Sequence, residues 1–97
     1  MLIRAVGPRL ADLGVTGVLA DPKFDVFRAG TAAAIASNDN WDAPLAATFN
    51  AVGAFGLTVG SRDAALVTSL TPGSYTVQVS GVNGGTGEAL VEIYEVP

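Results

Sequence analysis

Hydrophobic and polar residues alternate along the second half of the chain in the pattern that is typical of β-strands. Every second residue of the segment 75–80 is apolar, and the residues between them are polar. Because the side chains of a strand point alternately to its two faces, this segment has one apolar and one polar face. The last strand is predicted over residues 88–96, with Val91 and Ile93 on its inner face and Tyr94 on the other.

Further strands are predicted where short apolar runs end at residues that favour turns. Turn signals of this kind stand at residues 7–8, 21–22 and 71–74. One helical turn is expected at residues 9–13. The other expected strands cover residues 2–6, 23–28, 31–37 and 64–70.

One short helix is expected over residues 44–52. Leu45, Phe49 and Val52 recur at the spacing of one helical face, and a glycine follows as a stop. Short strands joined by turns, without regular alternation of strands and helices, indicate an all-β fold. We therefore expect a single domain over residues 1–97, an antiparallel β-sandwich or jelly roll with one short helix.

The composition is apolar for a chain of 97 residues, since 49% of them are hydrophobic, only 14% are charged, and the mean hydropathy is +0.45. Charged residues make up roughly 25% of an average soluble domain. Either abundant alanine and glycine raise the hydropathy without creating adhesive surface, or neighbouring domains or copies cover part of the apolar surface. The sequence leaves both interpretations open.

The charges and the residue types exclude several functions. The net charge is −4 and the five cationic side chains are scattered, so the chain lacks the basic patch that binding of nucleic acid requires. No run of about 18 apolar residues is present, and we expect no membrane span. The chain has no histidine and no cysteine, and Ser61 has no evident base. Nucleophilic catalysis therefore lacks its usual side chains, and the chain is predicted not to be an enzyme.

The most polar stretch of the chain is the loop SNDNWD at residues 37–42. Calcium prefers several oxygen ligands, and Asp39, Asn40 and Asp42 offer such oxygens close together. This loop is therefore the candidate metal site, and calcium is the candidate cofactor. The alternative is that these side chains bond to the backbone of the loop and that Asp42 caps the following helix.

Trp41 in the same loop also has two interpretations. An exposed indole offers a flat face for a sugar ring, which makes Trp41 the candidate contact for a polysaccharide or another surface ligand. A tryptophan beside a turn can instead anchor the loop on the core. Arg4 interrupts an apolar strand, and we expect it to pair with an acidic residue across the sheet.

Four segments together resemble a domain that is repeated in large secreted proteins of Verrucomicrobia and related bacteria. They are LIRAVGPRLADL at residues 2–13, SNDNW at 37–41, LTPGSYTVQVSG at 70–81 and GEALVEIYEV at 87–96. The second half is also similar, more loosely, to bacterial pre-peptidase C-terminal domains, which are small β-sandwiches. The resemblance implies a setting outside a bacterial cell or on its surface, and an accessory role without catalysis.

Members of that family usually carry a further strand-rich segment before the strand that matches residues 2–6, and we expect it to be absent here. If the fold is the same, one sheet edge is left open beside an apolar face, and a neighbouring chain or domain completes it. The candidate edge or donor strands are the first and the last. The residues expected to make this contact are Leu2, Ile3, Arg4, Ala5, Val6, Val91, Ile93 and Tyr94.

The sequence therefore favours a non-enzymatic extracellular structural module that assembles with copies of itself or with flanking domains. A contact that passes a strand from one subunit to the next without closing would give a filament. The alternative is an accessory module that binds carbohydrate or another surface partner and is stabilised by calcium.

Overall fold

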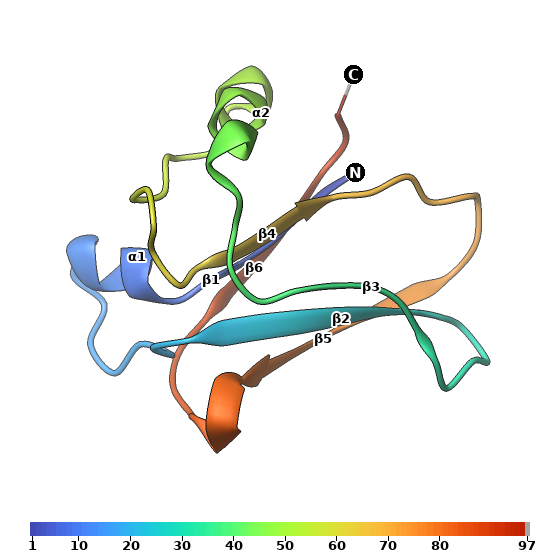
Figure 1. The fold of residues 1–97 in the computed structure, drawn as a ribbon, viewed down its shortest axis with the longest axis horizontal. Helices are drawn as coiled ribbons and strands as arrows, with labels where there is room; N and C mark the ends of the chain where they lie inside the picture. The colour runs from blue at the N-terminus through green and yellow to red at the C-terminus, as the bar shows by residue number, and fades with distance from the viewer. Residues whose placement is uncertain (97) are drawn as a thin grey trace.

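The computed structural model describes residues 1–96, and its six strands form two three-stranded antiparallel sheets (Figure 1). The strand order is β4-β1-β6 in the first sheet and β3-β2-β5 in the second. The strands are β1 (Leu2–Val6), β2 (Pro22–Arg28), β3 (Ala34–Asn38), β4 (Ala64–Val67), β5 (Tyr75–Gly81) and β6 (Leu90–Tyr94). The helical segments are α1 (Pro8–Asp12), η1 (Ala43–Leu45), α2 (Ala46–Val52) and η2 (Val82–Gly84), of which η1 and η2 are single 3₁₀ turns.

The all-β antiparallel class predicted from the sequence is confirmed, and the two sheets pack against each other as a small sandwich. The predicted short helix corresponds to η1 followed by α2, and the helical turn expected at residues 9–13 corresponds to α1. The finer assignment as a jelly roll stays a prediction.

The core between the sheets is built from alternate residues of the central strands. Ile3 and Ala5 of β1 and Ala64 of β4 meet Phe24 and Val26 of β2, and all five are buried. Ile3 and Ala5 are two positions apart in β1, as are Phe24 and Val26 in β2. Each strand therefore packs one of its faces into this core. Burying one side chain of the size of valine, isoleucine or phenylalanine stabilises a fold by about 1.5–3 kcal/mol. These contacts hold the two sheets together.

β1 is buried on both faces because its sheet is the middle of three layers. Leu2 and Val6 point away from the second sheet and lie in a cluster with Trp41, Phe49 and Leu57. All five residues of β1 are buried. In Figure 1, α2 lies above the first sheet, while β2 and β5 lie below it.

One expectation about the first sheet is wrong. The sequence predicts that an edge strand is formed by Leu2, Ile3, Arg4, Ala5 and Val6. β1 is instead the central strand, with β4 on one side and β6 on the other. A nearly continuous apolar run without a polar face is typical of a strand that is covered on both sides, and this explains its position. β6, by contrast, lies at the edge of the sheet.

Candidate functional site

One side of the sandwich is closed by the segment that leaves β3. The Oδ1 atom of Asn38 accepts a hydrogen bond of 3.0 Å from the backbone N–H of Ala65 in β4. The backbone N–H of Trp41 donates to the carbonyl oxygen of Asp63 at 3.0 Å. The chain thus crosses from the second sheet to the first and covers the outer edge of β4. The polar loop of the sequence motif therefore forms a seam between the sheets.

Trp41 is buried, with only 6% of its surface exposed. Its ring centre lies 5.2 Å from that of Phe49 in α2. Its Nε1 donates to the carbonyl oxygen of Thr58 and to Oγ of Ser61, both at 3.2 Å. Since the core encloses the indole, it offers no free face to a sugar ring. The interpretation of Trp41 as a ligand contact is wrong, and Trp41 anchors its loop on the core.

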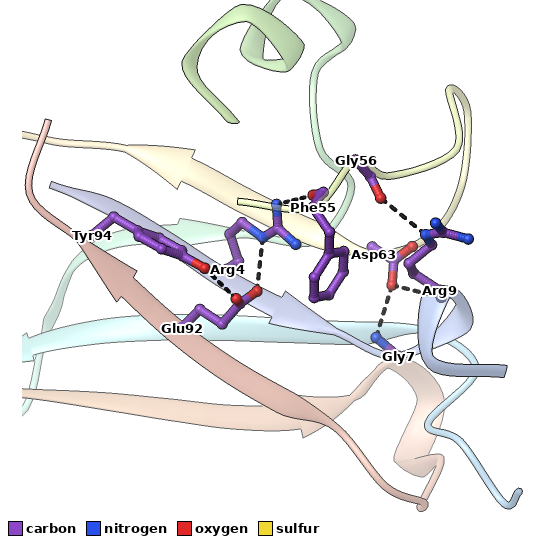
Figure 2. Close-up of polar contacts among 8 residues, drawn as sticks. All are labelled: Arg4, Gly7, Arg9, Phe55, Gly56, Asp63, Glu92 and Tyr94. Atoms are coloured by element: carbon purple, nitrogen blue, oxygen red, sulfur yellow. Dashed lines mark hydrogen bonds and ion pairs between the residues drawn. The ribbon is translucent and has the colours of Figure 1, made fainter. Parts of the chain in front are cut away.

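A buried carboxylate ties α1 to the start of β4. The Oδ1 atom of Asp63 accepts from the backbone N–H of Gly7 at 2.8 Å and from that of Arg9 at 3.3 Å (Figure 2). Its Oδ2 accepts from the hydroxyl of Ser61 at 2.7 Å. The first N–H groups of a helix have no partner within the helix, and Asp63 supplies one from elsewhere in the chain. The acceptor sites of Asp63 are therefore occupied by the fold.

The three residues of the candidate calcium site, Asp39, Asn40 and Asp42, all have exposed side chains. Within residues 1–96, no three acidic, histidine or cysteine side chains gather closely enough to hold a metal ion. Asp42 precedes η1, but its side chain makes no capping hydrogen bond, so the capping alternative is wrong. The calcium site stays a prediction.

The opposite side of the sandwich is open at β6. Val91 and Ile93 stand opposite Ala5 and Ile3 of β1, so they point toward the second sheet. The exposed fractions are nevertheless 44% for Val91 and 57% for Ile93. The second sheet therefore leaves this part of the apolar face uncovered.

The backbone of β6 is also free along this side. Just before β6, the carbonyl oxygen of Glu88 accepts a hydrogen bond of 2.8 Å from the N–H of Leu19. Leu19 lies directly against Gly7 at the end of β1, so this bond is on the β1 side of the strand. Backbone polar groups of successive strand residues point in alternating directions. Those of Val91 and Ile93 therefore point to the open edge.

Behind the open edge, Arg4 fixes β6 to β1. Arg4 is fully buried, and its Nε atom lies 3.0 Å from Oε1 of Glu92, which stands opposite it in β6 (Figure 2). Its Nη1 donates to the carbonyl oxygen of Phe55 at 2.7 Å. The guanidinium carbon lies 4.6 Å from the ring centres of both Phe49 and Phe55. The predicted cross-strand partner of Arg4 is therefore Glu92.

Tyr94 completes this cluster on the edge strand. Its hydroxyl donates a hydrogen bond to Oε2 of Glu92, as Figure 2 shows. This bond raises the pKa of Tyr94 above its ordinary value of 10.0, and desolvation and the charge of Glu92 raise it further, while Arg4 opposes them. Both oxygens of Glu92 are thus used within the chain, so β6 presents no free carboxylate at its centre.

A hollow of about 330 Å³ lies beside the turn between β2 and β3. Phe27 pairs with Thr76 across β2 and β5, and Gln78 stands two residues further along β5. Residues 28–32 form the remaining wall together with Val77. No sequence pattern marks this hollow, because it arises where the turn folds over the sheet.

No family model, no curated protein and no solved structure matches this chain. Residues 1–96 contain no helix with the length and apolar character needed to cross a membrane. The function therefore has to be inferred from the open edge of β6 and its surroundings.

Proposed function

We propose that this chain is a non-enzymatic structural module that binds an extended strand of a neighbouring chain or domain along the open edge of β6. The observation that carries the proposal is the combination of a free strand edge with the exposed apolar side chains of Val91 and Ile93. Unpaired strand edges bind further strands through backbone hydrogen bonds, and alternate side chains supply specificity.

The other edge of the first sheet is protected, and the edge of β6 is not. Asn38 bonds to Ala65 in β4, and Trp41 bonds to Asp63 just before that strand. Natural edge strands are also commonly blocked by lysine, proline or a bulge. β6 contains neither lysine nor proline. Its central charged residue, Glu92, is paired with Arg4, which lies behind the strand. This contrast favours β6 as an edge that is meant to be covered.

The composition agrees with this function. Low charge and high apolar content fit the interpretation that neighbours cover part of the surface. The setting outside a bacterial cell, which the sequence resemblance implies, belongs to the same proposal. In that setting the module would join neighbours in a larger surface structure.

The proposal is tested by measuring the molar mass of the chain in solution by size-exclusion chromatography with light scattering. We expect the wild type to exceed the mass of 9.8 kDa of a single chain. The double variant Val91→Lys with Ile93→Lys should return to that mass, because lysine at an edge prevents pairing. The matched control is Val59→Lys, since Val59 is 73% exposed in a loop. A double variant that still assembles would contradict the proposal, and a monomeric wild type would leave a different chain or a flanking domain as the neighbour.

A second candidate function is binding of a polysaccharide at the hollow beside Phe27. An aromatic ring next to the hydroxyl of Thr76 and the amide of Gln78 offers both a stacking surface and hydrogen bonds. Retention on immobilised polysaccharides measures this function. Phe27→Ala and Gln78→Ala should each lower retention, and Lys23→Ala on the same strand is the control. Absence of retention for the wild type removes this candidate.

A further inference from the structure

We infer that the neighbour at the open edge is a second copy of this chain, related by a two-fold axis so that β6 pairs antiparallel with β6 of the copy. The inference rests on the proposed function of this edge and names its partner. It follows from the directions of the backbone groups, from the charges along β6 and from the exposed apolar side chains of Val91 and Ile93.

The backbone of β6 is complementary to itself. The N–H and C=O groups of Val91 and Ile93 point outward, and in an antiparallel pair the residues that exchange both hydrogen bonds stand directly opposite each other. A two-fold axis that places any residue of β6 opposite itself satisfies this condition, because outward-pointing residues then meet outward-pointing residues. The three central positions for such an axis are Val91, Glu92 and Ile93.

The charges of the strand disfavour two of these three registers. An axis at Glu92 brings the carboxylates of the two copies directly opposite each other, and the Arg4 that pairs with each lies behind its own strand, so like charges face each other across the contact. An axis at Ile93 places Val91 opposite Glu95 of the copy, so a carboxylate enters the apolar face. Both registers therefore work against the pattern of the strand.

An axis at Val91 avoids both conflicts. Val91 then faces its own copy, Ile93 faces Ala89 of the copy, and these apolar residues share the face toward the second sheet. On the other face Glu92 stands opposite Leu90 of the copy. This register keeps one face apolar and places no two carboxylates of β6 opposite each other.

The result is a continuous sheet across the two copies, with the three strands of each first sheet side by side. The axis is perpendicular to this sheet, so both second sheets lie on the same side of it. The exposed Val91 and Ile93 of both copies meet there and cover each other. Such a contact uses the same surface twice and closes on itself, so it yields a dimer rather than a filament.

Single cysteines test the register directly, because the natural chain contains none. Residues exchanging both hydrogen bonds in an antiparallel pair have Cα atoms about 5.5 Å apart. That separation lies within the range of roughly 4.4–6.8 Å that a disulfide requires. The test variant is Val91→Cys. Ile93→Cys reports the alternative register, and Ser37→Cys on β3 and Ser80→Cys on β5 are exposed controls.

Under mild oxidation, Val91→Cys should form a disulfide-linked species of twice 9.8 kDa on a denaturing gel, and reducing agent should return it to the single-chain mass. The other three variants should remain mostly at the single-chain mass. Preferential cross-linking through Ile93→Cys or Ser80→Cys would overturn the inference.

Light scattering on the wild type separates the two levels of the hypothesis. If the wild type assembles but Val91→Cys forms no preferential cross-link, the two-fold contact is wrong and the strand-binding function stands. If the wild type is a monomer at every concentration, this inference fails, because the neighbour at the edge is then not a second copy.

Discussion

The Nε atom of Arg4 lies 3.0 Å from the Oε1 atom of Glu92, and the two residues join the buried central strand to the edge strand. The side chain of Arg4 is 0% exposed and that of Glu92 is 14% exposed. Their contact is an ion pair without the alignment of a hydrogen bond, since neither atom has a hydrogen-bond partner. The pair therefore provides charge neutralisation at the place where β6 meets the core.

Removing one partner of this pair should destabilise the chain strongly. Arg4→Met leaves the largely buried carboxylate of Glu92 without its countercharge, and loss of one member of a buried pair costs about 3–5 kcal/mol. Urea denaturation followed by circular dichroism measures this change in the free energy of unfolding. The control is Asp12→Asn, which removes the exposed pair with Arg9 at 3.3 Å and should cost less than about 1 kcal/mol.

The double variant Arg4→Met with Glu92→Leu should be more stable than Arg4→Met alone. An apolar pair of similar volume replaces a buried ion pair at little net cost, because no charge is left unpaired. If the double variant proves less stable than the single one, the charge of Glu92 is not what destabilises Arg4→Met.

Tyr94 should make the chain less stable at alkaline pH. The hydrogen bond to Glu92 raises the pKa of Tyr94 in the folded chain above its ordinary value of 10.0. Below pH 10 both the folded and the unfolded chain keep the phenolic proton, so the full contribution to stability is present. As the pH rises further, the unfolded chain releases this proton first, and the free energy of unfolding decreases through the folded pKa.

The measurement is urea denaturation between pH 8 and pH 11, expected to show this decrease above the ordinary tyrosine pKa of 10.0. Tyr94→Phe should flatten the alkaline decrease, while Tyr75→Phe, whose ring lies in the other sheet, should leave it in place. An unchanged profile in Tyr94→Phe would assign the alkaline loss to another group.

The alternation of residue types predicted much of the second half of the fold. The alternating apolar and polar residues 75–80 lie in β5. The expected acidic partner of Arg4 is Glu92, across the sheet. Strand ends were less predictable. Residues 64–70 were expected to be one strand, but β4 ends at Val67, which is 40% exposed. The apolar character of residues 64–70 does not reveal where the layers that cover this strand end.

The position of β1 and the burial of Trp41 depended on contacts between distant parts of the chain. The first strand was expected at a sheet edge because the resemblance implied a missing strand beside it, and the sequence does not show that Phe49, Phe55 and Glu92 enclose the charge of Arg4. The polar residues around Trp41 likewise indicated a surface loop. Only the fold shows that this loop crosses between the sheets.

Trp41→Ala should destabilise the chain by about 3–5 kcal/mol, the usual cost of truncating a buried aromatic residue. The indole contacts Phe49 and bonds to Thr58 and Ser61, so its removal leaves a cavity and two acceptors without their donor. Thermal denaturation measures the loss, and Val59→Ala in an exposed position should change little. A Trp41→Ala variant as stable as the wild type would show that the loop does not depend on this anchor.

The calcium hypothesis predicts stabilisation of the chain by the ion. A site at Asp39, Asn40 and Asp42 that is exposed to calcium at 100 times its dissociation constant should stabilise the fold by about 2.7 kcal/mol. Melting curves with calcium and with a chelator measure this difference. Asp39→Asn should abolish the shift, and Asp25→Asn, on β2, should not. Equal melting temperatures in both solutions would reject the site.

Gly7→Ala should destabilise the chain although the substitution adds only one methyl group. A Cβ atom at Gly7 would stand 2.0 Å from the carbonyl oxygen of Leu19, which is far inside contact distance and cannot be relieved by rotating a side chain. The backbone of one segment must therefore move, at a cost of about 1–3 kcal/mol or more. Gly56→Ala is the matched control, because no atom lies within 4 Å of its added Cβ. If the two variants denature at the same urea concentration, the close approach of Leu19 to Gly7 does not constrain the fold.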